Sequence, residues 1–170
     1  DVNGTANVGG LIGNNQGRAY DVYSEGNVYS KDGTAGGLFG TVAGAFGGKI
    51  ENSNATGNVT SHGNSVGGLI GSFGTHTNIT NSHAIGNVSG TGSVGGLAGY
   101  SDDNDVMIKD SYAIGHVIGT STYVGGLVGY LAGNGKRNIT NTYATGNVTI
   151  YGTAADAVGG LIGVITWGSV

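Results

Sequence analysis

A glycine-rich hexapeptide, Val-Gly-Gly-Leu-Ile-Gly or a close variant, recurs six times along this chain. A second motif lies between the copies and ends in Gly-Asn-Val or Gly-His-Val; it occupies residues 52–59, 81–88, 110–117 and 141–148, with a degraded copy at 21–28. The hexapeptides begin at Val8, Ala35, Val66, Val94, Val124 and Val158. A repeat of about 30 residues indicates an architecture in which each unit buries its apolar face against its neighbours.

The composition favours strands over helices. The chain has 38 glycines and no proline, and a glycine inside a helix costs about 1 kcal/mol relative to alanine. Short runs instead alternate with period two, so that Ala55, Gly57 and Val59 are expected to face inward and Thr56 and Asn58 outward. We therefore predict an all-β fold, a parallel β-solenoid of five to six coils. Each coil is expected to contain about 30 residues and three short strands, in a single domain spanning residues 1–170.

Stacking one repeat on the next places identical positions in columns. Asparagine side chains stacked in this way can hydrogen-bond along the column. Alanines at the centre of the second motif predict a thin interior there, and the paired glycines allow close approach of the backbone. One predicted ladder contains Asn52, Asn81, Asp110 and Asn141, and the other contains Asn58, Asn87, His116 and Asn147.

The hexapeptide does not fit simple alternation, because Val66 and Ile70 share parity while Leu69 opposes them. Either the glycine pair bulges and turns valine and leucine inward together, or both faces of the strand are apolar. An apolar column on the outer face would form a docking surface. The residues of this candidate self-association surface are Ile12, Phe39, Ile70, Val128 and Ile162.

Charge and composition exclude several functions. The net charge is −4 and only 9% of the residues are charged, which argues against binding to nucleic acid. The absence of cysteine removes disulfides and most zinc sites. No apolar run is long enough to cross a membrane, so membrane insertion is not expected. No residue pattern indicates a cofactor.

Few residues are candidates for chemistry. Asp102, Asp103 and Asp105 form the one dense acidic cluster and are candidate Ca²⁺ ligands, although the spacing is not that of an EF-hand and a solvated turn is the competing interpretation. Asp21 and Asp110 would lie three coils apart, roughly 14 Å at the inter-strand spacing. Glycosidase carboxylates lie about 5 to 9.5 Å apart. We therefore expect no catalytic residues and no enzymatic activity.

Three asparagines with outward parity lie in Asn-x-Ser/Thr sequons and are candidate glycosylation sites. They are Asn58, Asn87 and Asn147. Because all three belong to a predicted ladder, a role in stacking competes with modification.

The Val-Gly-Gly-Leu-x-Gly core, followed by tyrosine at Tyr100 and Tyr130, resembles the GLUG motif repeat. The preceding run from Tyr143 to Val148 strengthens the resemblance, which extends over essentially the whole chain. It implies a β-solenoid from a large prokaryotic surface or secreted protein such as an adhesin, without an activity of its own and without catalytic residues to carry over.

Both ends of the chain are expected to lie in mid-coil without polar caps. This predicts an extracellular homo-oligomer or polymer, present here in its mature form, whose coils assemble edge to edge into a cell-surface layer, sheath or filament. The first alternative is a stalk or binding module of a larger bacterial or archaeal adhesin, with surface glycans as candidate partners. The second is a polysaccharide-acting β-helix enzyme.

Overall fold

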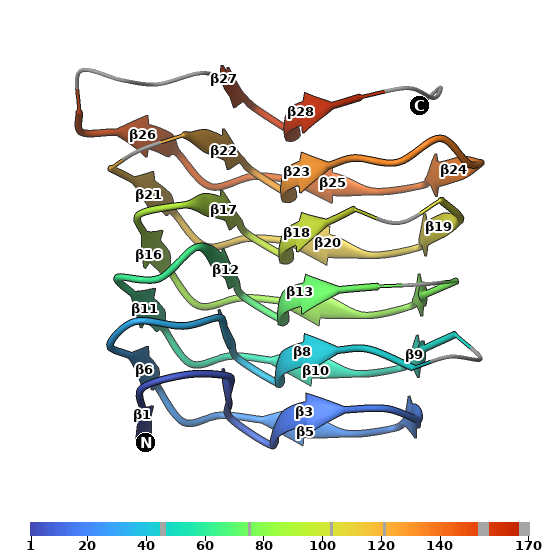
Figure 1. Cartoon of the computed structure of the whole chain (residues 1–170), viewed down its shortest axis with the longest axis horizontal. Helices are drawn as coiled ribbons and strands as arrows, with labels where there is room; N and C mark the ends of the chain where they lie inside the picture. Colours follow the sequence, from blue (N-terminus) through green and yellow to red (C-terminus); the bar gives the residue numbers. More distant parts are fainter. Residues whose placement is uncertain (45–46, 75, 103, 121, 153–156, 167–170) are drawn as a thin grey trace.

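The chain folds as a stack of flattened coils, and the prediction of an all-β parallel solenoid is confirmed (Figure 1). The computed structural model describes residues 1–44, 47–74, 76–102, 104–120, 122–152 and 157–166. Every regular element in these ranges is a β-strand. Each strand pairs in parallel with its equivalents in the neighbouring coils, so five sheets run along the stack. Within the same ranges, no helix is long and apolar enough to cross a membrane.

The five sheets, named A to E in this article, have the following strands. Sheet A contains β1 (Val2–Gly4), β6 (Val28–Ser30), β11 (Val59–Ser61), β16 (Val88–Gly90), β21 (Val117–Gly119) and β26 (Val148–Ile150). Sheet B contains β2 (Val8–Gly9), β7 (Ala35–Gly36), β12 (Ser65–Gly67), β17 (Ser93–Gly95), β22 (Tyr123–Gly125) and β27 (Ala157–Gly159). Sheet C contains β3 (Ile12–Asn15), β8 (Phe39–Val42), β13 (Ile70–Phe73), β18 (Ala98–Ser101), β23 (Val128–Leu131) and β28 (Ile162–Ile165).

The strands of the two remaining sheets lie on either side of the Asn or Asp that begins the second motif. Sheet D contains β4 (Arg18–Tyr20), β9 (Lys49–Glu51), β14 (Asn78–Thr80), β19 (Val106–Lys109) and β24 (Arg137–Thr140). Sheet E contains β5 (Tyr23–Ser24), β10 (Asn54–Ala55), β15 (His83–Ala84), β20 (Tyr112–Ala113) and β25 (Tyr143–Ala144).

Among the described residues, each of the first five coils contains five short strands, and the last coil contains β26, β27 and β28. The prediction of three strands in every coil was therefore wrong. Two of the three predicted runs are split by a bend. The Ile-to-Ala run is divided between sheets D and E by a residue with positive φ, such as Asn81 at 47°. The hexapeptide is divided between sheets B and C at Gly68 and Leu69, where the chain turns between β12 and β13.

The register follows the repeat. Ile79 pairs with Ile108, and Val66 pairs with Val94, so equivalent positions lie directly above one another. The predicted alternation is also observed, because Ala55, Gly57 and Val59 are buried. Insertions between repeats therefore lie in the turns and leave the stacking of the strands unchanged.

The interior is divided into two apolar clusters. The valines of sheets A and B form one cluster, and the inward side chains of sheets C, D and E form the other together with the leucines of the hexapeptide. Between them the coil is thin: a Cβ added at Gly68 would lie 2.7 Å from the Cβ of Ala84. The turn at Gly68 directs Val66 and Leu69 inward together, which was one of the two alternatives for the hexapeptide.

The prediction of an outer apolar stripe was wrong. Phe39, Ile70 and Val128 have no exposed surface, because the turn after the glycine pair directs the start of sheet C into the core. Ile12 is 39% exposed and Ile162 is half-buried. These two residues lie in the first and last coils, where a neighbouring coil is present on one side only.

The bend between sheets D and E explains why asparagine or aspartate recurs at this position. Asp21, Asn52, Asn81, Asp110 and Asn141 all have φ between 47° and 53°. Among residues with a side chain, Asn and Asp adopt this left-handed conformation most readily.

We expect Asn81→Ala to lower the free energy of unfolding by about 1 to 3 kcal/mol, because it combines strain at positive φ with loss of a hydrogen bond to Asn52. Asn81→Gly removes the hydrogen bond but tolerates the bend. Chemical denaturation should therefore rank stability as wild type, then Asn81→Gly, then Asn81→Ala. Equal stability of the two variants would contradict the role of the bend.

Candidate functional site

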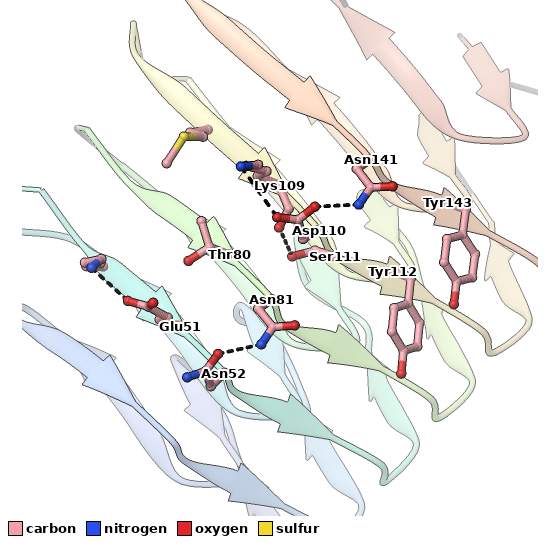
Figure 2. A pocket seen from close by; sticks show the side chains of 12 residues that line it. Glu51, Asn52, Thr80, Asn81, Lys109, Asp110, Ser111, Tyr112, Asn141 and Tyr143 are labelled. Carbon is pink, nitrogen blue, oxygen red and sulfur yellow. Dashed lines mark hydrogen bonds and ion pairs between the residues drawn. The ribbon is translucent and has the colours of Figure 1, made fainter.

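A groove of about 860 Å³ runs along the outer side of the bend between sheets D and E (Figure 2). It extends over several coils, so its walls are columns of the repeat. Sheet D and the bend supply amides, hydroxyls and two lysine–carboxylate pairs, and sheet E supplies tyrosines. The lining residues are Lys49, Glu51, Asn52, Thr80, Asn81, Met107, Lys109, Asp110, Ser111, Tyr112, Asn141 and Tyr143.

The floor of the groove is the column at the bend, the first of the two predicted ladders. Asn52 Nδ2 donates to Asp21 Oδ1 at 3.0 Å, and Asn81 Nδ2 donates to Asn52 Oδ1 at 2.6 Å. Further along, Asn141 Nδ2 donates to Asp110 Oδ1. All of these donors point towards the N-terminal coil, so the column has a direction.

The column is interrupted between Asn81 and Asp110. An ionised carboxylate has no hydrogen to donate, so Asp110 cannot pass a hydrogen bond to Asn81 as an asparagine would. Asn81 uses its amide nitrogen on Asn52, and its amide oxygen is directed away from Asn52 (Figure 2). Two acceptors therefore occupy successive positions of the column, at the centre of the groove.

The charges in the groove are balanced in pairs. Lys49 Nζ lies 2.7 Å from Glu51 Oε2, and this hydrogen bond raises the pKa of Lys49 above its ordinary value. Lys109 Nζ lies 3.7 Å from Asp110 Oδ2. The groove therefore presents polar groups without a net excess of either sign.

The second wall of the groove is an aromatic stack on sheet E. The rings of His83 and Tyr112 are 4.7 Å apart and nearly parallel, and those of Tyr112 and Tyr143 are 4.9 Å apart. Both faces of the Tyr112 ring are thus covered by neighbours. The stack offers the edges of its rings and its hydroxyl groups to a ligand, which corresponds to the surface ladder that outward tyrosines in register are expected to form.

We predict a pH-dependent loss of stability from His83. Burial lowers the pKa of His83 below its ordinary value of 6.5, so below this pH the unfolded chain binds a proton more readily than the folded chain. The free energy of unfolding should therefore fall as the pH is lowered from about 8 to about 5.5. His83→Tyr matches Tyr112 and Tyr143 in the column and should reduce this dependence in denaturation curves. An unchanged dependence in the variant would contradict the assignment.

The second predicted column uses a different pattern of hydrogen bonds. Its side chains accept from the backbone of the next coil: Asn87 N donates to Asn58 Oδ1 at 2.9 Å, His116 N donates to Asn87 Oδ1 at 2.9 Å, and Asn147 N donates to His116 Nδ1 at 3.0 Å. The candidate glycosylation sites Asn58, Asn87 and Asn147 are exposed. Their modification stays a prediction.

The candidate Ca²⁺ ligands do not form a site in the part of the chain that the structure describes. Asp103 lies outside the described residues. The carboxylate of Asp105 accepts a hydrogen bond from Lys136 N at 3.0 Å and lies 3.4 Å from His76 Nε2. Among the described residues, no three His, Cys, Asp or Glu side chains gather in a group that could hold a metal ion.

Two features were missed from the sequence. A buried serine column lies next to the bend, where Ser53 N donates to Ser82 Oγ and Ser82 N donates to Ser111 Oγ, both at 3.1 Å. The recurrence of Ser after Asn was the available indication. Arg137 is also buried, and its guanidinium donates to the carbonyls of Gly133 and Thr166. It replaces an apolar residue of the column, Val106, so no sequence pattern indicated it.

The family model of the GLUG motif matches one coil of the solenoid. The match begins directly after β21, includes β22, β23, β24 and β25, and ends within β26. Residues 120–149 are a GLUG motif. The resemblance predicted from the sequence is thus confirmed for residues 120–149, and the unit that carries it is one coil. Equivalent positions of the two neighbouring coils pair in register with this GLUG coil.

The chain is also similar to halomucin from Haloquadratum walsbyi, with 46% identity over 74 residues. The match covers 42% of this chain and 1% of halomucin, so the chain corresponds to a small part of that relative. The comparison with solved structures gave no match. The GLUG motif and the similarity to halomucin together indicate a surface or secreted repeat protein.

Proposed function

We propose that this chain is a non-catalytic structural repeat protein of a prokaryotic cell surface, and that its coils assemble edge to edge with those of other copies into a layer, sheath or filament. The observation that carries this proposal is the equivalence of successive coil interfaces. All five sheets continue from coil to coil in the same parallel register. A surface that stacks on its own copy in this way supports head-to-tail assembly, which does not close on itself.

The hexapeptide column shows how much apolar surface one coil buries on the next. In the hexapeptide column, Leu38 has no exposed surface, whereas Leu11 in the first coil is 46% exposed. In the last coil, Val158 is 45% exposed, although Val124 below it is fully buried. Docking of another coil on either face would bury this apolar area and pair the backbone groups of the outermost strands.

Gly160→Ala tests the proposal. At the equivalent Gly126, an added Cβ would lie 2.1 Å from the carbonyl oxygen of Gly160 in the next coil, whereas a Cβ at Gly160 has nothing within 4 Å. The variant should therefore fold normally but should clash with any coil that stacks on its outer face. We expect concentration-dependent assembly of the wild type in sedimentation and negative-stain microscopy, and a folded monomer for the variant.

A matched control is Gly74→Ala in an inner coil, where the added Cβ would make an ordinary contact at 3.9 Å with Val42 O. This variant should fold and assemble as the wild type does. A wild type that stays monomeric at high concentration, or a Gly160→Ala variant that assembles normally, would argue against edge-to-edge assembly.

The second candidate is a segment of a stalk or binding module in a larger adhesin. The support is the small share of halomucin, 1%, that the chain matches. In that case further coils would come from the same polypeptide, and an isolated monomer would be the expected result for the chain studied alone. A polysaccharide-acting enzyme has less support, because the groove carboxylates Glu51 and Asp110 each pair with a lysine.

A further inference from the structure

We propose that the groove over the bend between sheets D and E binds a neutral glycan, and that two neighbouring sugar hydroxyls donate to Asn81 and Asp110. This inference goes beyond the structural function proposed above and does not depend on assembly. It rests on the interruption of the side-chain ladder, on the paired charges beside it, and on the shape of the groove along the stack (Figure 2).

The side-chain ladder lacks a hydrogen-bond donor between Asn81 and Asp110. Asn52 donates to Asp21, Asn81 to Asn52 and Asn141 to Asp110, but Asp110 has no hydrogen to give to Asn81. The two groups occupy successive coils, as shown by the pairing of Thr80 with Lys109 next to them. A sugar carries hydroxyl groups on neighbouring carbons. One of them can donate to the amide oxygen of Asn81 and the next to the carboxylate of Asp110, and each can also accept from a neighbouring donor such as Lys109.

The charge balance selects a neutral ligand. Lys109 lies 3.7 Å from Asp110, so the carboxylate already has a cationic partner, and a bound metal cation would have to compete with it. An anionic ligand would meet the carboxylate of Asp110 in the centre of the groove. Lys49 is likewise paired with Glu51. A polyhydroxylated ligand without charge neither competes with Lys109 for the carboxylate nor is repelled by that carboxylate.

The remaining lining fits a sugar. Thr80 supplies a hydroxyl group, Met107 supplies an apolar side chain, and Tyr112 supplies a ring edge. Since the faces of Tyr112 are covered by His83 and Tyr143, recognition depends on hydrogen bonds rather than on stacking over a ring. Successive coils are about 4.8 Å apart, comparable with the length of one pyranose ring in an extended glycan. An oligosaccharide lying along the stack would thus meet equivalent columns at each ring.

The test is Asp110→Asn, which separates binding from folding. The introduced side-chain amide would donate to Asn81 and complete the ladder, while its oxygen could still accept from Asn141, so the variant should be at least as stable as the wild type. The amide hydrogen would occupy the place of the sugar hydroxyl that donates to Asn81. The control is Asp21→Asn, which makes the same change of charge in the same column but outside the groove.

The probes are maltohexaose, cellohexaose and mannohexaose, with a hexagalacturonate as the acidic counterpart, each followed by amide chemical shifts in NMR titrations. We expect at least one neutral oligosaccharide to bind at millimolar concentration and to shift amides around Asn81 and Asp110. Asp110→Asn should weaken this binding about tenfold, the value of one hydrogen bond to a charged group, and Asp21→Asn should leave it unchanged. Binding of none of the three, preference for the acidic probe, or full binding by Asp110→Asn would overturn the proposal.

Discussion

Gly68→Ala is expected to prevent folding of the chain. A Cβ at this position would lie 2.1 Å from the carbonyl oxygen of Gly96 in the next coil and 2.7 Å from the Cβ of Ala84 across the thin part of the interior. The first of these contacts is with the backbone of the turn between β17 and β18. There Gly96 O accepts a hydrogen bond from Gly68 N at 3.1 Å, so it cannot move away without breaking this bond between the two coils. The variant should lack the strand signal in circular dichroism and should exchange its amide hydrogens without protection.

The same substitution in the last coil is the control. Gly160 occupies the equivalent position of its hexapeptide, but a Cβ there has nothing within 4 Å. Gly160→Ala should therefore retain the wild-type spectrum in dilute solution. If the two alanine variants were equally stable, the close approach of neighbouring coils at the glycine pair would not be a requirement of the fold.

The fold class and the register followed from the sequence because a parallel stack places each residue on its own counterpart. The period of the hexapeptide therefore predicted the pairing of Val66 with Val94 without any knowledge of the turns. The inward direction of Ala55 and Val59 followed from their shared parity in a short strand. Both inferences depend only on the spacing of residues along an extended chain.

The bends were harder to predict, and they decided where the groove lies. A positive φ at Asn52 or Asn81 divides one run into two strands, and the sequence indicated only that Asn or Asp recurs there. The turn after the glycine pair placed Phe39 and Ile70 inside in their respective coils, where parity alone had left their direction open. Sequence alone predicted that Asp110 shares a column with asparagines. The consequence, an interrupted ladder inside a groove, needed the directions of the hydrogen bonds.

Leu97→Ala is expected to lower the free energy of unfolding by about 2 to 5 kcal/mol. Leu97 has no exposed surface, and its backbone pairs with both neighbouring coils, through Leu69 N to Leu97 O and Leu97 N to Leu127 O, each at 2.8 Å. Because Leu69 and Leu127 are held by their own coils, the cavity left by the side chain cannot close by collapse. Denaturation with urea should report the loss directly.

Leu11→Ala is the matched control for Leu97→Ala, since Leu11 occupies the same position of the hexapeptide but is 46% exposed. Its truncation should cost about 1 kcal/mol or less in dilute solution. The location of the damage gives a second readout: in a stack stabilised by contacts between neighbouring coils, amide exchange in Leu97→Ala should increase most in the coils that contain Leu69, Leu97 and Leu127. A uniform increase along the whole chain, or equal losses in the two variants, would show that the stack unfolds without regard to the contacts of single coils.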